Sequence, residues 1–212
     1  MTTREERFYN FEVRVAGEPT ADTPTATITG RPIVYGQVTD IGPFDEVIDR
    51  GALDDTDLKD VPLLVNHDRS RIPVARSRNN TPNSTMQLNV DGQGMAISRA
   101  DLDVENNSEA RALYSAVRRG DITGMSFAFR VGDERWENLD SDHPTRHILR
   151  IEKVYEVSAV TYPAYDRTEI QARDKEALES ARRELESARS KSLDRDALDL
   201  EKQKIEILYG RR

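Results

Sequence analysis

Short runs of apolar and β-branched residues alternate with polar, glycine- or proline-containing stretches along most of the chain. Their length and composition are typical of β-strands bounded by turns. The segment 86–102 contains DGQG between two such runs, which predicts a hairpin. The runs predicted to form strands are FYNFEVRV at 8–15, ATITGRPIVYGQVTDI at 26–41 (two strands or one bent strand), VPLLVNHD at 61–68, MQLNVDGQGMAISRADL at 86–102, DITGMSFAFRVGDERW at 121–136 and RHILRIEKVYEVSAVTYPAY at 146–165 (one long or two shorter strands).

Two segments within this region have a helical pattern. Residues 107–119 place apolar side chains at Ala110, Leu113 and Val117, and Gly120 then provides a C-terminal stop. The acidic segment FDEVIDRGALDDTD at 44–57 predicts a short helix. Many strands with one or two helices indicate an α+β fold. We therefore predict a β-barrel-like core of about six or more mainly antiparallel strands with one or two flanking helices.

The texture of the chain changes at about residue 169. From there to residue 212 the sequence is highly charged, and its weak apolar spacing predicts a charged C-terminal helix. The spacing does not support a long coiled coil, so a docked helix and a solvated, partly disordered extension both remain open. We predict a domain at 1–168 and a helical tail at 169–212. The apolar positions of the tail are Leu178, Ala181, Leu185 and Ala188.

Composition excludes several classes of protein. The chain has 212 residues with a formal net charge of −8, which argues against a general nucleic-acid binder. No apolar run is long enough for a membrane span, and the N-terminus has no apolar secretion segment. Cysteine is absent, which removes disulfides and thiolate chemistry and fits a reducing cytosol.

Three residues form a chemically coherent set. His67 ends an apolar run, where its imidazole would emerge from the core, and Ser126 lies in ITGMSFAF at the start of a predicted strand. Glu156 lies within an apolar, β-branched strand, either on a solvent face or beside a partner that compensates its burial. A serine hydroxyl needs an imidazole base, and that imidazole needs a third group to fix its tautomer. Each residue alone has an ordinary structural explanation, but together they predict a serine hydrolase.

The other two histidines leave alternatives open. His143 lies in SDHPT, a context typical of a surface loop, and His147 begins the following strand. A metal-dependent hydrolase would combine His67 and Asp68 with His143 or His147, although the spacing matches no known ligand motif. A non-catalytic assembly or scaffolding protein is a further alternative.

The motifs NHD, GMSFAF and EVSAVTYPAY, in this order, resemble those of the bacteriophage prohead proteases. ITGRPIVYGQ and FDEVIDRGAL resemble the N-terminal region of that family, so the likeness extends from about Phe11 to Arg167. The family is similar in fold to herpesvirus assemblins. The resemblance implies that Ser126 is the nucleophile and His67 the general base.

The third catalytic position then falls on Glu156. Herpesvirus relatives use a second histidine instead, which keeps His147 as a rival. By the same analogy, the oxyanion would be stabilised by backbone near Asp166 and Arg167.

The resemblance also implies a setting and partners. The expected function is a serine endopeptidase that acts inside the assembling procapsid, in the host cytoplasm. It would cleave the major capsid protein or its scaffold segment and also itself, without cofactor, metal, nucleic acid or membrane. Self-association is left open. The tail has no motif that the resemblance covers, but its helical, charge-balanced texture leads to the hypothesis that it holds the enzyme to the capsid or scaffold until cleavage.

Overall fold

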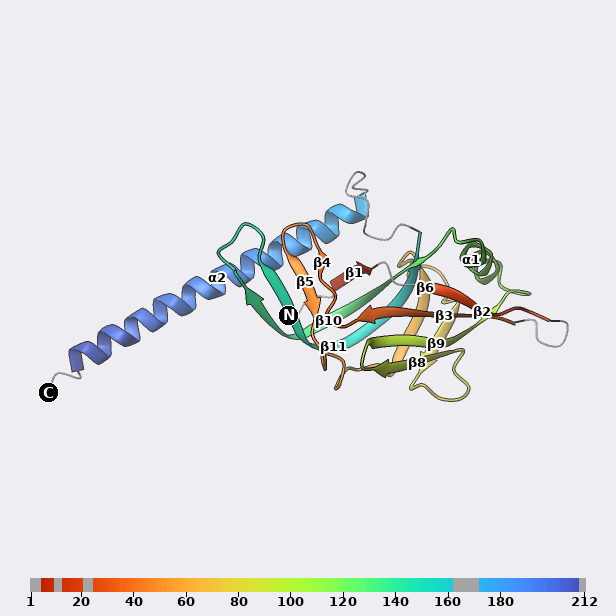
Figure 1. Cartoon of the computed structure of the whole chain (residues 1–212), viewed down its shortest axis with the longest axis horizontal. Coiled ribbons are helices and arrows are strands. Elements are labelled where there is room, and N and C mark those ends of the chain that lie inside the picture. Colours follow the sequence, from red (N-terminus) through yellow and green to blue (C-terminus); the bar gives the residue numbers. More distant parts are fainter. Residues whose placement is uncertain (1–4, 10–12, 21–24, 162–171, 210–212) are drawn as a thin grey trace.

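A long antiparallel hairpin of strands β10 and β11 runs through the centre of the molecule (Figure 1). The computed structural model describes residues 5–9, 13–20, 25–161 and 172–209. Within these residues the elements are β1 (Glu5–Tyr9), β2 (Val13–Gly17), β3 (Thr25–Val34), β4 (Thr39–Asp40), β5 (Asp45–Ile48), β6 (Asp60–Val65), β7 (Ala75–Arg78), β8 (Met86–Asp91), β9 (Gly94–Asp103), α1 (Ser108–Arg119), β10 (Gly124–Glu137), β11 (Thr145–Val160) and α2 (Ala172–Tyr209).

The described strands form two sheets. The larger sheet has the order β1-β10-β11-β5-β4, and β6 and β7 extend it from a different part of β11. The smaller sheet has the order β2-β3-β9-β8 and is antiparallel throughout. The prediction of an α+β fold with mainly antiparallel strands is confirmed, but the two sheets do not close into a barrel. Buried side chains of both sheets share one hydrophobic core, which includes Ile28, Ile33, Phe127 and Phe129.

Local sequence signals place α1 and the β8–β9 hairpin correctly. The Asn107 side chain accepts hydrogen bonds from the backbone N–H groups of Glu109 and Ala110, at 3.0 and 3.1 Å, which caps the first turn of α1. Gly120 ends the helix in the left-handed conformation, with φ of 79°. Gly94 begins β9 with φ of 139°, and a Cβ there would lie 2.1 Å from the carbonyl oxygen of Ile33. Only glycine fits this crossing.

The helix predicted at 44–57 is wrong. Residues 45–48 form β5, which pairs in parallel with β11, and turns follow at 50–55. Glu46, Val47 and Ile48 are all buried. Pairing with a central strand outweighs the weak helical preference of this acidic segment. The strand predicted at 8–15 is also divided between β1 and β2, and residues 10–12 lie outside the described part.

A buried arginine on β11 connects three other strands of the larger sheet to the helix α2. Arg146 on β11 is 2% exposed, and its guanidinium contacts carboxylates of Glu5, Glu46, Glu134 and Glu184. These lie on β1, β5, β10 and α2, respectively. The Nη1 atom alone lies 2.6 Å from Glu5, 3.0 Å from Glu46 and 2.9 Å from Glu184. We call these five residues the Arg146 cluster.

Replacing Arg146 with methionine is expected to lower the free energy of unfolding by at least about 3 kcal/mol, because Glu5 and Glu46 would stay buried without this counter-charge. Urea unfolding followed by circular dichroism measures the change. Arg150→Met is the matched control: Arg150 is exposed on the same strand and should change stability by no more than about 0.5 kcal/mol. Equal stability of the two variants would contradict this prediction.

The helix α2 is docked through its first half. Ala181 and Leu185 are buried against Phe44, whose ring meets Trp136 edge-on with centroids 4.9 Å apart. The Arg189 guanidinium donates hydrogen bonds to the carbonyl oxygens of Leu139 and Ser141, at 3.1 and 2.7 Å.

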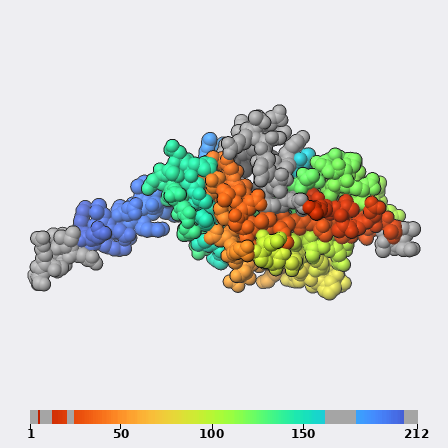
Figure 2. All heavy atoms as spheres, in the orientation of Figure 1, coloured from red at the N-terminus to blue at the C-terminus, as the bar shows by residue number. Residues whose placement is uncertain are grey.

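Beyond this point α2 projects away from the sheets (Figures 1 and 2). Leu193, Leu198 and Leu200 are 70%, 53% and 53% exposed. The first half of α2 is therefore docked, and these leucines of its second half are exposed to solvent. Neither α1 nor the described part of α2 has the length and apolarity that a membrane span requires.

Candidate active site

The imidazole of His67 reaches the central hairpin because β6 ends in a tight turn. The backbone N–H of Asn66 donates to the carbonyl oxygen of Ala159 at 2.9 Å, which continues the parallel pairing of β6 with β11 by one residue. Asn66 and His67 then adopt φ values of 51° and 57°. This left-handed conformation is uncommon outside glycine, although asparagine and histidine tolerate it better than most residues. Two consecutive residues of this kind direct the chain sharply away from the strand.

The structure brings His67, Ser126 and Glu156 into direct contact. The Nε2 atom of His67 lies 2.7 Å from Oγ of Ser126, and its Nδ1 lies 2.5 Å from Oε1 of Glu156. An ionised carboxylate can only accept, so Nδ1 carries the proton and Nε2 is left to accept from the serine hydroxyl. The side chains of His67 and Glu156 are 7% and 1% exposed, and Ser126 is fully buried. This arrangement can transfer a proton from the hydroxyl to the imidazole.

Strand register explains why the three side chains meet. On the hairpin, Ser126 is opposite Ser158, and Ala128 is opposite Glu156. Residues opposite one another, or two apart on a strand, lie on the same face of a sheet. Ser126 and Glu156 therefore face the same side, and His67 approaches it from the end of β6, the strand on the far side of β11.

A fourth side chain, Ser158, was not predicted to belong to this site. Its hydroxyl donates to Oε2 of Glu156 at 2.7 Å and accepts from the backbone N–H of His67 at 3.2 Å. Ser158 is fully buried. It therefore fixes the carboxylate and the left-handed backbone of His67 at once. The available signal was its position two residues after Glu156, on the same strand face.

Replacing Ser158 with alanine is expected to lower kcat/KM for peptide cleavage by about ten- to a hundredfold. The expectation follows because a hydrogen bond to a charged group contributes about 1.5–3 kcal/mol. Initial cleavage rates on a protein substrate measure it. Ser77→Ala is the matched control, since Ser77 is equally buried but lies on β7 and bonds to Asn80. A Ser158 variant as active as the Ser77 variant would show that the bridge has no role in catalysis.

Comparison with known proteins places this geometry in context. A family model described as caudovirus prohead serine protease matches residues 10–183. The chain belongs to this family. No curated protein and no solved structure gives a significant match. The match confirms the family resemblance, begins just after β1 and ends within α2.

Membership in the prohead protease family carries general consequences. It makes the chain a serine peptidase of capsid maturation, with capsid proteins as its class of substrate. Proteases of this kind work within the procapsid in the host cell. The family match identifies no individual catalytic residue, so the roles of Ser126, His67 and Glu156 stay predictions that the contacts above support.

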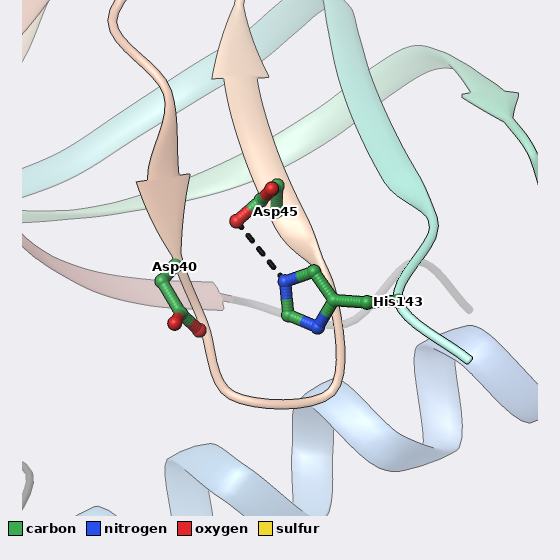
Figure 3. Close-up of side chains that lie close together, drawn as sticks. All are labelled: Asp40, Asp45 and His143. Atoms are coloured by element: carbon green, nitrogen blue, oxygen red, sulfur yellow. Dashed lines mark hydrogen bonds and ion pairs between the residues drawn. The ribbon is translucent and has the colours of Figure 1, made fainter. Parts of the chain in front are cut away.

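In this prohead protease the other two histidines lie in different pairs. His147 Nδ1 lies 2.9 Å from a carboxylate oxygen of Asp49, and His143 Nε2 lies 3.1 Å from Asp45 (Figure 3). Among the described residues, the groups close enough to share a metal ion are Asp40, Asp45 and His143, all at least partly exposed. They do not include His67 or Asp68. The geometry therefore does not assemble the ligand set of the metal-dependent alternative.

The predicted oxyanion region cannot be placed. Asp166 and Arg167 lie outside the described residues. At the last described position before them, the Thr161 backbone N–H donates to the side-chain oxygen of Asn66 at 2.9 Å. The Asn66 amide group in turn donates to the Thr161 hydroxyl at 3.0 Å. These bonds tie the end of β11 to the turn that carries His67.

Proposed function

We propose that the chain is a serine endopeptidase that cleaves the major capsid protein or its scaffold segment, and also itself, during procapsid maturation. The observation that carries this proposal is the continuous series of contacts from Ser126 through His67 to Glu156, at 2.7 and 2.5 Å. In this proposal Ser126 is the nucleophile, His67 the general base and Glu156 the residue that orients the imidazole.

The proposed reaction is acyl transfer in two stages. The oxygen of Ser126 bonds to the carbonyl carbon of the peptide while its proton passes to Nε2 of His67. The C–N bond of the resulting tetrahedral intermediate then breaks, and His67 gives the proton to the leaving amine. Water attacks the ester in the same way, His67 accepts its proton, and Ser126 regains a proton as the carboxyl product leaves.

Glu156 supports this sequence by stabilising the imidazolium formed in each stage. Its Oε1 accepts from Nδ1 of His67, and its Oε2 is held by Ser158. His147, the rival for the third position, pairs with Asp49 instead. The contacts therefore favour Glu156 in this role.

Co-expression with the major capsid protein of the same phage, followed by mass measurement of both proteins, tests the proposal. We expect shortened capsid protein, with cleavage blocked by a serine-directed fluorophosphonate and unaffected by a metal chelator. Unchanged masses, together with no fluorophosphonate labelling, would favour the non-catalytic scaffolding alternative. Inhibition by the chelator alone would favour the metal-dependent one.

The projecting half of α2 is proposed to retain the enzyme in the procapsid. Its leucines are more than half exposed, whereas the first half of the helix is docked. Truncation after Ser192 would remove Leu193, Leu198 and Leu200 and keep the contacts of Ala181, Leu185 and Arg189. We expect this variant to cleave purified capsid protein normally but to be depleted from procapsids, as measured by quantitative mass spectrometry. Normal packaging would refute this role.

A further inference from the structure

The candidate nucleophile is closed to substrate in this structure. Ser126 is fully buried, and the imidazole beside it is 7% exposed. A peptide carbonyl must approach the serine oxygen to within about 3–3.5 Å before a bond can form. Some segment next to Ser126 must therefore move before the enzyme can act.

The strand β1 lies along the strand that carries the nucleophile. β1 lies beside β10 (Figure 1) and pairs antiparallel with its first part. Phe8 is directly opposite Ser126. The pairing extends from Glu5 opposite Phe129 to Tyr9 opposite Met125. The other edge of β10 is occupied by β11, which carries Glu156. The outer edge of β10 is thus where an extended peptide could pair beside the nucleophile, and the chain's own N-terminal segment occupies it.

Different contacts hold the two ends of β1. At its start, the Glu5 carboxylate accepts from Nη1 and Nη2 of Arg146 at 2.6 and 3.0 Å. Beyond its end, the backbone N–H of Val13 donates to the carbonyl oxygen of Thr123 at 3.3 Å. Separation of β1 from β10 therefore has to break the ion pair at Glu5, while β2 can keep its own pairing with β3. β1 also precedes residue 10, where the family match begins.

We infer that β1 is an autoinhibitory strand that an extended substrate peptide replaces on the edge of β10. The exchange loses no backbone hydrogen bonds on the edge of β10, because the incoming peptide replaces those that β1 gives up. It also places the peptide backbone alongside Ser126. The inference rests on the proposed peptidase function and adds to it the binding mode of the substrate and a closed resting state.

A reversible cross-link tests the exchange, because the natural chain has no cysteine. Glu6 is opposite Ala128, and facing residues of antiparallel strands lie within the Cα separation that a disulfide spans. The variant Glu6→Cys/Ala128→Cys would fasten β1 to β10 when oxidised and release it when reduced. The matched control is Arg14→Cys/Thr29→Cys, which joins β2 to β3 in the other sheet.

Cleavage of the purified major capsid protein is the main readout. We expect oxidation to slow cleavage by the β1–β10 variant at least about tenfold, with recovery on reduction, because the open state becomes inaccessible. Oxidation of the β2–β3 variant should leave the rate unchanged. Equal rates for the oxidised and reduced β1–β10 variant would overturn the inference.

A second variant tests the same inference without a cross-link. Glu5→Gln weakens the contact with Arg146 and should raise the rate of capsid-protein cleavage several-fold. An unchanged or lower rate, in a variant that keeps the wild-type circular dichroism spectrum, would count against β1 as a displaceable strand. Failure of the proposed function is distinguishable, because the wild-type chain would then neither cleave the capsid protein nor react with a fluorophosphonate.

Discussion

Replacing Ser126 with alanine is expected to lower the rate of capsid-protein cleavage by about 10⁵- to 10⁶-fold, the loss found when a serine protease loses its nucleophile. The change removes one oxygen from a fully buried residue. It leaves an unfilled acceptor at Nε2 of His67 and no group able to form the acyl ester. The rate is measured from the masses of capsid-protein fragments over time.

Ser77→Ala provides the control for this loss. It removes the same atom from another fully buried serine and should keep wild-type cleavage. Circular dichroism and the urea midpoint should match between the two variants, which separates chemistry from folding. Residual cleavage within about tenfold of wild type would remove Ser126 from its proposed role, because loss of a nucleophile costs far more.

Replacing Glu156 with glutamine is expected to lower kcat by about 10³- to 10⁴-fold with a smaller effect on KM. Glutamine keeps the shape of the side chain but lacks the negative charge that stabilises the imidazolium. Its amide group would also favour the wrong tautomer of His67 when it faces Nδ1. Steady-state cleavage of a peptide that spans the capsid cleavage site measures both constants.

His147→Ala is the matched comparison, because it tests the rival third position. His147 contacts Asp49 and lies apart from the three-residue set. We expect this variant to retain kcat within about threefold, as is usual for a partly exposed residue outside the reacting groups. A large loss in His147→Ala with a small loss in Glu156→Gln would reverse the assignment.

The features that could be predicted from the sequence are those set by neighbours along the chain. The helix α1 has its own cap, apolar face and glycine stop, so it needs no distant partner to be recognised. The turn of the β8–β9 hairpin is held by Asp91, which accepts from the backbone N–H of Gln93 at 2.8 Å. Hydrogen bonds from the Arg31 guanidinium, which has the larger effect, and from the Gln93 backbone N–H stabilise the ionised Asp91 carboxylate. They lower the pKa of Asp91 to about 2.

The features that could not be predicted depend on pairing between distant segments. The parallel pairing of β5 with β11 joins residues about a hundred positions apart, and its acidic sequence alone suggested a helix. His67, Ser126 and Glu156 were selected for their chemistry and family resemblance, but only the register of β6, β10 and β11 shows that they meet.

Ser158 and Arg146 illustrate the same limit. Ser158 looked like one more hydroxyl in an apolar strand, although it bridges two members of the site. No role for Arg146 was predicted from the sequence. Its burial follows from carboxylates that four separate elements bring to it, which no local pattern reveals.

Arg146 also couples the N-terminal strand β1 to the C-terminal helix α2, because both contact its guanidinium. Glu184 of the tail and Glu5 of the N-terminal strand compete for the same nitrogen, Nη1. If self-cleavage removed α2, one competitor and one negative charge would leave, and the bond to Glu5 would strengthen. The trimmed enzyme would then hold β1 more firmly on the edge of β10, beside Ser126. Under the proposed autoinhibition, loss of the tail would therefore favour the closed state and slow further cleavage.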